Sequence, residues 1–315
     1  MVVTNARYRY HVENELAEFG ASAAHYILGV LEASMYQPRI SIITTTYNCV
    51  DTVEQCVSSV VRQTYPNIEY LVIDGGSTDE TVAVLQRYAE HFSYWVSEPD
   101  KGIYDAMNKG VAHATGDFVY FLGADDCLFD DQTITRVAAA LKPNMDIWLS
   151  GVMVVNEDNG LEHYSFNDTI RNLDTWDNNM TPHQGIFARK ELLVRHPFDV
   201  SLRIIADQKW LIQSVHQDKV HLGYGDFPVA YYSAQGLSST SGQAEWDQEE
   251  RQLAEDTGVK VKQVPLSMPF MRKYMKGFTR SVGLYGYIKY VLDRYHRGWR
   301  KHHCSNAICR WCHRY

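Results

Sequence analysis

The sequence lacks the long apolar run that a membrane-spanning helix requires. No segment holds 18 consecutive apolar residues, which is near the shortest stretch that crosses a bilayer. The first residues, Met1 to Arg7, turn polar and charged at once, so we expect no secretory signal peptide. Cysteine is also scarce, with six in 315 residues, and proteins outside the secretory route keep their thiols reduced. We therefore expect a cytoplasmic protein without disulfides or spanning helices.

Basic charge is scarce outside the C-terminal segment. The formal net charge is −8, yet residues 271–315 hold eleven Lys and Arg against one acidic residue, a net charge of +10. The remaining residues carry 19 basic and 37 acidic side chains, a net charge of −18. Nucleic-acid-binding domains show a basic binding face, so the acidic body argues against nucleic acid as a partner. An anionic partner is expected for the basic segment alone.

The most informative segment is an apolar run that ends in two acidic residues. Residues 118–122 are apolar, Gly123 and Ala124 follow as a turn, and Asp125 and Asp126 come next. In open α/β sheets, ligands bind at the carboxyl ends of the strands. Adjacent carboxylates repel each other unless a cation or a donor lies between them, and hard divalent cations prefer carboxylate and phosphate oxygens. The pair therefore indicates a metal ion that binds phosphate, although Asp is also a common turn residue.

Three earlier segments repeat this plan of a buried strand with a polar end. Residues 40–46, 70–74 and 93–97 have the β-branched and apolar composition of strands, and Ser77 with Glu80 resembles a helix-start capping box. Strands that alternate with helices through short connections predict an α/β protein with a mostly parallel sheet covered on both faces. Right-handed crossovers bring the strand ends to one edge. The polar ends expected to converge there are Thr46 with Tyr47, Asp74, Asp100 with Lys101, and Asp125 with Asp126.

The chain divides into three parts by pattern. Residues 1–37 are expected to form a helical extension, 38–260 one catalytic domain, and 261–315 a basic amphipathic tail. After Asp126 the alternation loosens. There the pattern predicts helices at 133–141, 204–216 and 246–256, and strands at 147–155, 161–166, 184–188 and 227–232.

Several motifs of the central part resemble one enzyme family. They are SIITTTYN (41–48), SSVVRQTYP (58–66), VIDGGSTDET (72–81), SEPDKGIYDAMNKG (97–110) and ATGD (114–117). Together they are similar to the family 2 glycosyltransferases of the GT-A fold, above all to bacterial enzymes that build capsule, exopolysaccharide and O-antigen. The resemblance is dense over 39–130 and thinner to about 240, and it says almost nothing about which sugar is transferred.

The resemblance implies a Rossmann-like nucleotide-binding half, a smaller acceptor half, and inverting transfer from a nucleotide-sugar with Mn²⁺ or Mg²⁺. Carried over by motif position, Thr46 and Tyr47 contact the nucleotide, and Tyr47 stacks on the base. Asp74 accepts a base N–H, which favours uracil and hence a UDP-sugar. Asp125 meets the ribose and Asp126 binds the metal. A divalent ion suits this chemistry because the departing diphosphate gains negative charge.

Inversion also needs a base for the proton of the acceptor hydroxyl. The resemblance places an Asp at a helix start in the second half, and Asp207 fits, although Ala206 stands where many relatives carry an acidic residue. Asp199 is the competing candidate. His183 and Gln184 resemble a family feature on the acceptor side that contacts the acceptor or the diphosphate, and a structural histidine is the alternative.

Lys101 has two interpretations, a phosphate ligand or a solvated turn lysine.

The tail repeats apolar residues every three or four positions over 271–299, with basic and aromatic residues between them. This pattern predicts a helix on an anionic membrane surface, at the inner face of the plasma membrane, where a polyprenyl-linked acceptor would reside. A helical pair packed on the acidic body is the alternative. His and Cys residues within 302–313 indicate either zinc or a reduced terminus without metal.

The expected function is transfer of a hexose or N-acetylhexosamine from a UDP-sugar to a glycan or lipid-linked acceptor in surface polysaccharide biosynthesis. One alternative is a nucleotidyltransferase of the same fold, which needs a Gly-rich basic signature that residues 45–48 lack. Another is an inactive sugar-binding or scaffold module. The intact carboxylates at Asp74, Asp125, Asp126 and Asp207 argue against that loss of activity.

Overall fold

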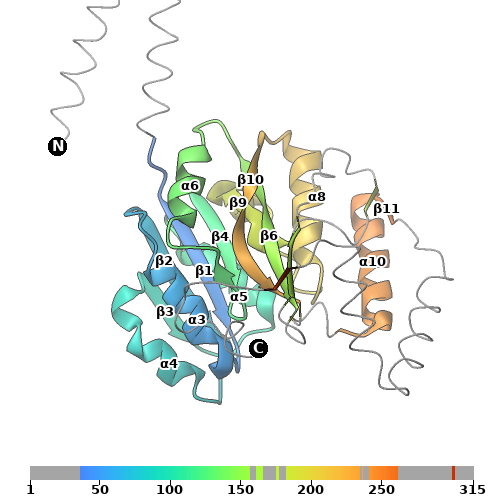
Figure 1. The fold of residues 1–315 in the computed structure, drawn as a ribbon. Helices are drawn as coiled ribbons and strands as arrows, with labels where there is room; N and C mark the ends of the chain where they lie inside the picture. The colour runs from blue at the N-terminus through green and yellow to red at the C-terminus, as the bar shows by residue number, and fades with distance from the viewer. Residues whose placement is uncertain are drawn as a thin grey trace, which may run out of the picture.

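A curled sheet of ten strands forms the centre of the molecule, which we describe from a computed structural model (Figure 1). The structure describes residues 36–156, 161–165, 175–176, 182–234, 236, 241–261 and 300–301. The strand order is β12-β7-β6-β9-β4-β1-β2-β3, with β10 paired to β6 and β5 paired to β10. The predicted α/β class with a mostly parallel central sheet is confirmed.

The strands are β1 Ile40–Thr46, β2 Ile68–Asp74, β3 Tyr94–Ser97, β4 Phe118–Gly123, β5 Cys127–Leu128, β6 Ile147–Asn156, β7 Leu161–Ser165, β8 Thr175–Trp176, β9 Ile186–Arg189, β10 Leu222–Ser233, β11 Lys260–Val261 and β12 Arg300–Lys301. The helices are α3 Val50–Val61, α4 Thr81–Arg87, η1 Ala89–His91, α5 Ile103–His113, α6 Thr133–Ala140, η3 His183–Gly185, α7 Lys190–Arg195, α8 Ala206–Asp218 and α10 Gln243–Thr257.

The first four strands form a parallel unit in the order β3-β2-β1-β4. Their register aligns Thr46 with Asp74, Asp74 with Ser97, and Thr45 with Gly123. The chain order reverses between β1 and β4, and the crevice at the carboxyl ends of such strands is where α/β proteins bind ligands. The predicted polar strand ends therefore lie at one edge.

The second half of the sheet mixes directions. Strand β9 runs antiparallel to both β4 and β6, so β6 is parallel to β4. Strand β10 runs parallel to β6 with two shifts of register, and it starts at Leu222, five residues before the predicted strand. Strand β5, directly after Asp126, pairs with β10. The turn with the two acidic residues is thereby fixed on both sides by strands.

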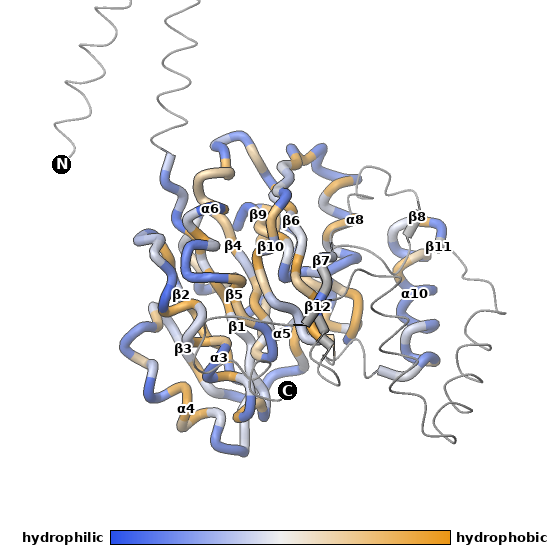
Figure 2. The backbone as a smooth tube through the Cα atoms, viewed as in Figure 1, coloured by the Kyte–Doolittle hydropathy of each residue, from blue (hydrophilic) through white to orange (hydrophobic). Residues whose placement is uncertain are grey.

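Apolar helix faces cover both sides of the sheet. Val57 of α3, Leu85 of α4 and Ile134 of α6 belong to one buried cluster. The cluster on the other face includes Met107 of α5, Leu193 of α7, Trp210 of α8 and Leu253 of α10. Figure 2 shows hydrophobic colour concentrated along the central strands, while α10 is largely hydrophilic. The long apolar strands are thus buried on both faces, as their composition predicts.

The two ends of the chain fall largely outside the described residues. The predicted extension (1–37) is described only from Tyr36, and the predicted tail (261–315) only at residues 261 and 300–301. The backbone of β12 pairs antiparallel with β7, which brings this short part of the tail to the sheet. Two-residue strands β8 and β11 form a separate small sheet. Within the described parts, no helix has the length and apolar character needed to span a membrane.

The described cysteines are free thiols. Cys56 and Cys127 are buried, and Cys49 is half-buried. Burial raises the pKa of the Cys49 thiol to about 11, so this thiol is protonated and unreactive at neutral pH.

Candidate active site

The end of β2 holds a buried carboxylate whose oxygens are already occupied. Asp74 is fully buried. Its Oδ1 accepts hydrogen bonds from the hydroxyls of Thr46 (2.8 Å) and Ser77 (2.5 Å). Its Oδ2 accepts from the backbone N–H of Gly76 and Ser77 and from the hydroxyl of Ser97 (2.6 Å). Burial acts to raise the pKa of Asp74, but the hydrogen bonds from Ser77, Ser97 and Thr46 outweigh it and hold the pKa below its ordinary value.

These contacts bear on two sequence predictions, which stay predictions. Asp74 was expected to accept a nucleobase N–H; it is fully buried and receives three hydrogen bonds from its own loop and one each from Thr46 and Ser97. Thr46 was expected to contact the nucleotide, but its side chain is 3% exposed and points to Asp74. Both residues instead tie together the ends of β1, β2 and β3.

Tyr47, directly after β1, is the large aromatic side chain available at this edge. It is 64% exposed. The next residue, Asn48, has a left-handed backbone with φ of 45°, a conformation that Asn tolerates better than most residues. The Asn48 Oδ1 accepts the backbone N–H of Thr78 at 2.8 Å and so joins the β1 loop to the β2 loop. The Tyr47 ring is therefore presented to solvent from a fixed loop.

A second carboxylate lies beside the end of β2. Gly75 has no side chain, and a Cβ atom placed there would lie 2.5 Å from Oδ2 of Asp100. The other oxygen, Oδ1, accepts the backbone N–H of Gly102 at 2.8 Å. Asp100 is half-buried, whereas Lys101 beside it is exposed. The carboxylate of Asp100 thus fills the space that a residue larger than Gly75 would need.

The end of β4 brings two carboxylates together. A Cβ atom at Gly123 would lie 2.6 Å from Oδ2 of Asp126 and 2.9 Å from Oδ1 of Asp125. Gly236 approaches Asp125 from another side, since a Cβ there would lie 3.2 Å from Oδ2 of Asp125. Two carboxylate oxygens therefore face one small space over a residue that has no side chain. This donor set fits a hard divalent cation such as Mn²⁺ or Mg²⁺, which often uses one or two carboxylates together with substrate phosphates.

Asp126 is held from two other elements. It is 2% exposed; its Oδ2 accepts from Nε2 of Gln184 at 2.6 Å, and its Oδ1 accepts the backbone N–H of Ser233 at 2.8 Å. Gln184 lies in η3, and Ser233 ends β10. Among the described residues, no group of three or more His, Cys, Asp or Glu side chains is arranged to hold a metal. An ion at this place would take its remaining ligands from outside that set.

Asp207 lies in the first turn of α8 and is 9% exposed. Its Oδ1 accepts from the hydroxyl of Tyr104 at 3.0 Å and from the backbone N–H of Gln208 at 2.9 Å. Its Oδ2 lies 3.1 Å from Nδ1 of His183. Burial, and then the charge of Asp207, raise the pKa of Tyr104 well above its ordinary value, so the phenol remains a donor. The structure thereby brings together two predicted residues, Asp207 and His183.

Tyr104 is a site residue that the sequence reasoning missed. It stands within the 97–110 motif, one position beyond Ile103, and helical spacing gave it no apolar role. Its hydroxyl reaches from α5 to α8 across more than one hundred residues of sequence, where it also donates to the backbone oxygen of Ile204. Tyr104 stands within a motif that resembles the family, but nothing in the sequence indicates that its hydroxyl contacts Asp207.

Asp199, the competing candidate for the base, has a different surrounding. Its Oδ2 accepts from Nζ of Lys209 at 2.6 Å, and its Oδ1 accepts from Ser201. Burial acts to raise the pKa of Asp199, but the bonds from Lys209 and Ser201 hold it below the ordinary value. Lys209 is 6% exposed and also pairs with Asp256 of α10. Asp199 is therefore part of an ion network that joins α8 and α10.

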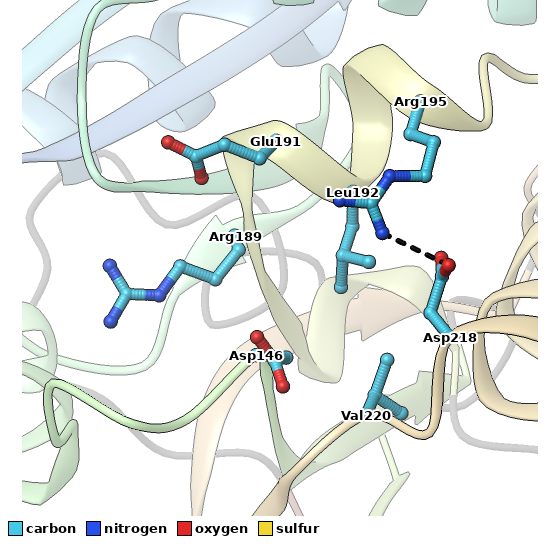
Figure 3. Close-up of a pocket in the computed structure, with 7 residues that line it drawn as sticks. All are labelled: Asp146, Arg189, Glu191, Leu192, Arg195, Asp218 and Val220. Carbon is cyan, nitrogen blue, oxygen red and sulfur yellow. Dashed lines mark ion pairs between the residues drawn. The ribbon is translucent and has the colours of Figure 1, made fainter.

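A cavity of about 310 Å³ lies away from these groups (Figure 3). It is lined by Asp146, Arg189, Glu191, Leu192, Arg195, Asp218 and Val220. Asp146 precedes β6, and Arg189 pairs with the first residue of β4, so the cavity lies at the amino edge of the sheet. Arg195 pairs with Asp218, and Arg189 donates to the backbone oxygens of Met145 and Pro143. The charged groups of Arg189, Arg195 and Asp218 are therefore engaged in contacts within the protein.

Comparison with known proteins agrees with this geometry. The family model described as glycosyl transferase family 2 matches residues 41–198. An uncharacterised glycosyltransferase of Mycobacterium tuberculosis is 34% identical over 185 residues, which are 56% of this chain and 69% of the relative. A PGL/p-HBAD biosynthesis glycosyltransferase of Mycobacterium bovis is 34% identical over 211 residues, which are 65% of this chain and 81% of the relative.

Solved structures share the fold. TarS of S. aureus has a TM-score of 0.54 at 19% identity, over 69% of this chain and 39% of TarS. The mannosyltransferase PcManGT of Pyrobaculum calidifontis, in complex with GDP-Man and Mn²⁺, has a TM-score of 0.54 at 20% identity, over 85% of this chain and 80% of that chain. Because the family model covers half of this chain and relatives at 34% identity match over most of their own length, the chain belongs to glycosyl transferase family 2 and is a glycosyltransferase.

Proposed function

We propose that this glycosyltransferase moves a hexose or N-acetylhexosamine from a UDP-sugar to a hydroxyl of a glycan or lipid-linked acceptor, with inversion and with Mn²⁺ or Mg²⁺. The observation that carries the proposal is the pair of carboxylate oxygens over Gly123 at the ligand-binding edge of the sheet. That pair follows β4 and Asp100 follows β3, with β1 and β2 between these strands and the exposed Tyr47 directly after β1.

Tyr47 and Asp100 would hold the base. An exposed aromatic ring on a fixed loop offers a stacking surface for a nucleobase. A carboxylate acceptor suits bases with an imino N–H, which uracil and guanine have and cytosine lacks. In this proposal Asp100 takes the role that the sequence assigned to Asp74, because Asp74 is buried and fully hydrogen-bonded. TarS has been solved with UDP-GlcNAc and PcManGT with GDP-Man, so both bases occur among proteins of this fold.

Asp125 and Asp126 would hold the metal ion, and Lys101 is placed to pair with phosphate. Bound there, the ion would offset the charge that a diphosphate leaving group gains. Gln184 and the backbone of Ser233 fix Asp126 before any ligand arrives. Such prior positioning is what makes electrostatic stabilisation effective, because the groups need no rearrangement during the reaction.

The acceptor side would be formed by Asp207 and His183. Direct displacement at the sugar carbon inverts its configuration and requires removal of the hydroxyl proton. Asp207 and His183 are the paired acidic and basic side chains on the acceptor half of this edge.

The three parts of the chain would have different roles. In this proposal residues 38–260 form the catalytic domain, 1–37 a helical extension, and 261–315 a basic tail that meets an anionic membrane surface carrying a lipid-linked acceptor. The role in surface polysaccharide biosynthesis rests on the sequence motifs.

The proposal is tested by Gly123→Ala. The added methyl group would displace both carboxylates, so we expect Mn²⁺-dependent binding of UDP to weaken at least tenfold, about 1.4 kcal/mol, and nucleotide release from an accepted sugar donor to be lost. The measurement is calorimetric titration of UDP with Mn²⁺ and with EDTA, followed by nucleotide release over a panel of UDP- and GDP-sugars.

Gly242→Ala is the matched control, because a Cβ atom there would meet nothing within 4 Å. It should bind and turn over donor as the unaltered chain does. Unchanged Mn²⁺-dependent binding in Gly123→Ala would remove the metal from this place. Failure of the unaltered chain with every donor would end the proposed function.

A further inference from the structure

The imidazole of His183 has one nitrogen in use and one without a partner. Its Nδ1 lies 3.1 Å from Oδ2 of Asp207. Its Nε2 is buried and meets no hydrogen-bond partner among the residues that the structure describes. Buried polar atoms of native proteins are almost always hydrogen-bonded, so an exception within a binding site indicates a catalytic or ligand-bound role. The side chain is 17% exposed and lies at the same edge as the paired carboxylates.

Asp207 is committed to internal contacts on both oxygens. Three donors converge on it, the hydroxyl of Tyr104, the backbone N–H of Gln208 and Nδ1 of His183. Each of these hydrogen bonds occupies a lone pair of the carboxylate that a substrate hydroxyl would otherwise use. The hydroxyl of buried Tyr104 lies within hydrogen-bond distance of two acceptors, Oδ1 of Asp207 at 3.0 Å and the backbone oxygen of Ile204 at 2.8 Å. The carboxylate is therefore suited to holding the imidazole more than to receiving a substrate proton.

We infer that Nε2 of His183, and not a carboxylate oxygen of Asp207, accepts the proton of the acceptor hydroxyl. This inference rests on the proposed function and assigns its proton acceptor. In the neutral imidazole, an N–H at Nδ1 that donates to Asp207 leaves the lone pair on Nε2. Asp207 is then a positioning residue, which selects the tautomer and stabilises the imidazolium, as the carboxylate does in Ser-His-Asp enzymes.

The step balances as a single displacement. The O–H bond of the acceptor breaks and its proton moves to Nε2 of His183. The oxygen forms a bond to the anomeric carbon, while the bond from that carbon to the diphosphate breaks and its electron pair leaves with the nucleoside diphosphate. The imidazolium later returns its proton to water.

The charged groups around His183 favour this role. Asp207 faces it from α8, and Tyr104 from α5 supports Asp207. Glu249 of α10 binds the backbone just before α8. Gln184, the next residue in η3, donates to Asp126 and so connects the proton acceptor to the side where the leaving group would bind. Asp207 is thus the carboxylate that contacts the imidazole, with Oδ2 at 3.1 Å from Nδ1.

The test is His183→Ala with chemical rescue. We expect the turnover number for nucleotide release to fall at least 100-fold, while the dissociation constant of the donor stays within about threefold and thermal unfolding shows a folded protein. Added imidazole should restore part of the turnover, and substituted imidazoles should restore it in the order of their basicity. His183→Gln fills the space, so imidazole should not rescue it.

His216→Ala is the matched control, because His216 is exposed on the same helix as Asp207. Its turnover should equal that of the unaltered chain and should not respond to imidazole. Unchanged turnover in His183→Ala, or loss of turnover without rescue while donor binding is intact, would overturn the inference. Absence of turnover and donor binding in the unaltered chain would instead reject the proposed function, and the inference with it.

Discussion

Asp74 is the last residue of β2 and Asp100 lies in the loop after the neighbouring strand β3, and their surroundings differ. Asp74 is fully buried beneath five hydrogen-bond donors, so a ligand would have to displace its own loop to reach it. Asp100 accepts the backbone N–H of Gly102 and stands over the backbone of Gly75, which has no side chain. The residue type is the same, but Asp74 is fully enclosed whereas Asp100 is half-buried.

We predict that Asp100→Asn weakens discrimination between bases. The carboxylate accepts the imino N–H of uracil, whereas it repels the N3 lone pair of cytosine, and the amide removes the charge behind both effects. A charge-assisted hydrogen bond contributes about 1.5–3 kcal/mol, so UDP binding should weaken roughly tenfold or more. The ratio of UDP to CDP affinity, measured by titration calorimetry with Mn²⁺, should narrow by a similar factor.

Asp51→Asn is the control for this change, since Asp51 is exposed in the first turn of α3. It should leave the UDP to CDP ratio as it is. If Asp100→Asn also keeps the ratio, Asp100 does not contact the base.

At the scale of elements, the start of α8 depends on α10. Glu249 of α10 is 6% exposed and accepts the backbone N–H groups of Arg203 (2.7 Å), Ile204 (2.9 Å) and Ile205 (3.1 Å). These N–H groups directly precede α8, where no residue of the helix can accept them. A carboxylate also suits the positive end of a helix. The acidic α10 therefore positions the turn that carries Asp207.

We predict that Glu249→Gln destabilises this junction. The amide loses the charge and one of its two acceptor oxygens, and the cost of leaving a buried donor unsatisfied is about 1–3 kcal/mol. The free energy of unfolding, from urea titration, should fall by that amount, and turnover should fall because Asp207 is less well placed. Glu255→Gln, at an exposed position of α10, should change neither value; equal behaviour of the two variants would contradict the role of Glu249.

The sequence predicted most elements but not their ends. Ser77 and Glu80 were expected to form a capping box, yet α4 begins at Thr81, and the Ser77 hydroxyl donates to Asp74. The Ser77 hydroxyl therefore binds Asp74 instead of capping the start of α4. Strand β5 was not predicted, because two residues carry no periodicity and their pairing with β10 is a contact across the chain.

At the scale of the whole molecule, carboxylates with a lowered pKa are distributed through the fold. For Glu69, burial acts to raise the pKa, but hydrogen bonds from Ser41 and Thr115 lower it below the ordinary value of 4.5. The pKa of Asp74 likewise lies below 3.8. In each case the folded state binds its proton at lower pH than the unfolded state does. Their stabilisation is therefore complete above the ordinary pKa and is lost as pH falls through the folded pKa.

We predict that the free energy of unfolding decreases as pH drops below about 4.5. Asp74→Asn should be less stable than the unaltered chain by about 2 kcal/mol at pH 7, because the amide group opposes donors from Ser77. This difference should narrow below the ordinary aspartate pKa of 3.8, because the unfolded state takes up a proton there before the folded state does. Urea unfolding between pH 7 and pH 3 measures it, with Asp51→Asn as control, and a difference that stays constant with pH would contradict the assignment.

The sequence by itself determined the α/β architecture, a mostly parallel sheet and the edge where polar residues gather, because strand composition and helical spacing are local properties and crossovers have one hand; the strand order came from the structure. Only the tertiary structure decided which of those polar residues face a ligand. Asp74 and Asp100 are the same residue type in the sequence. They differ because hydrogen-bond donors at the ends of β1, β2 and β3 enclose Asp74, whereas Gly75 leaves room for the Asp100 side chain. Burial and hydrogen-bond partners arise from residues far apart in the chain, so no local pattern could assign them.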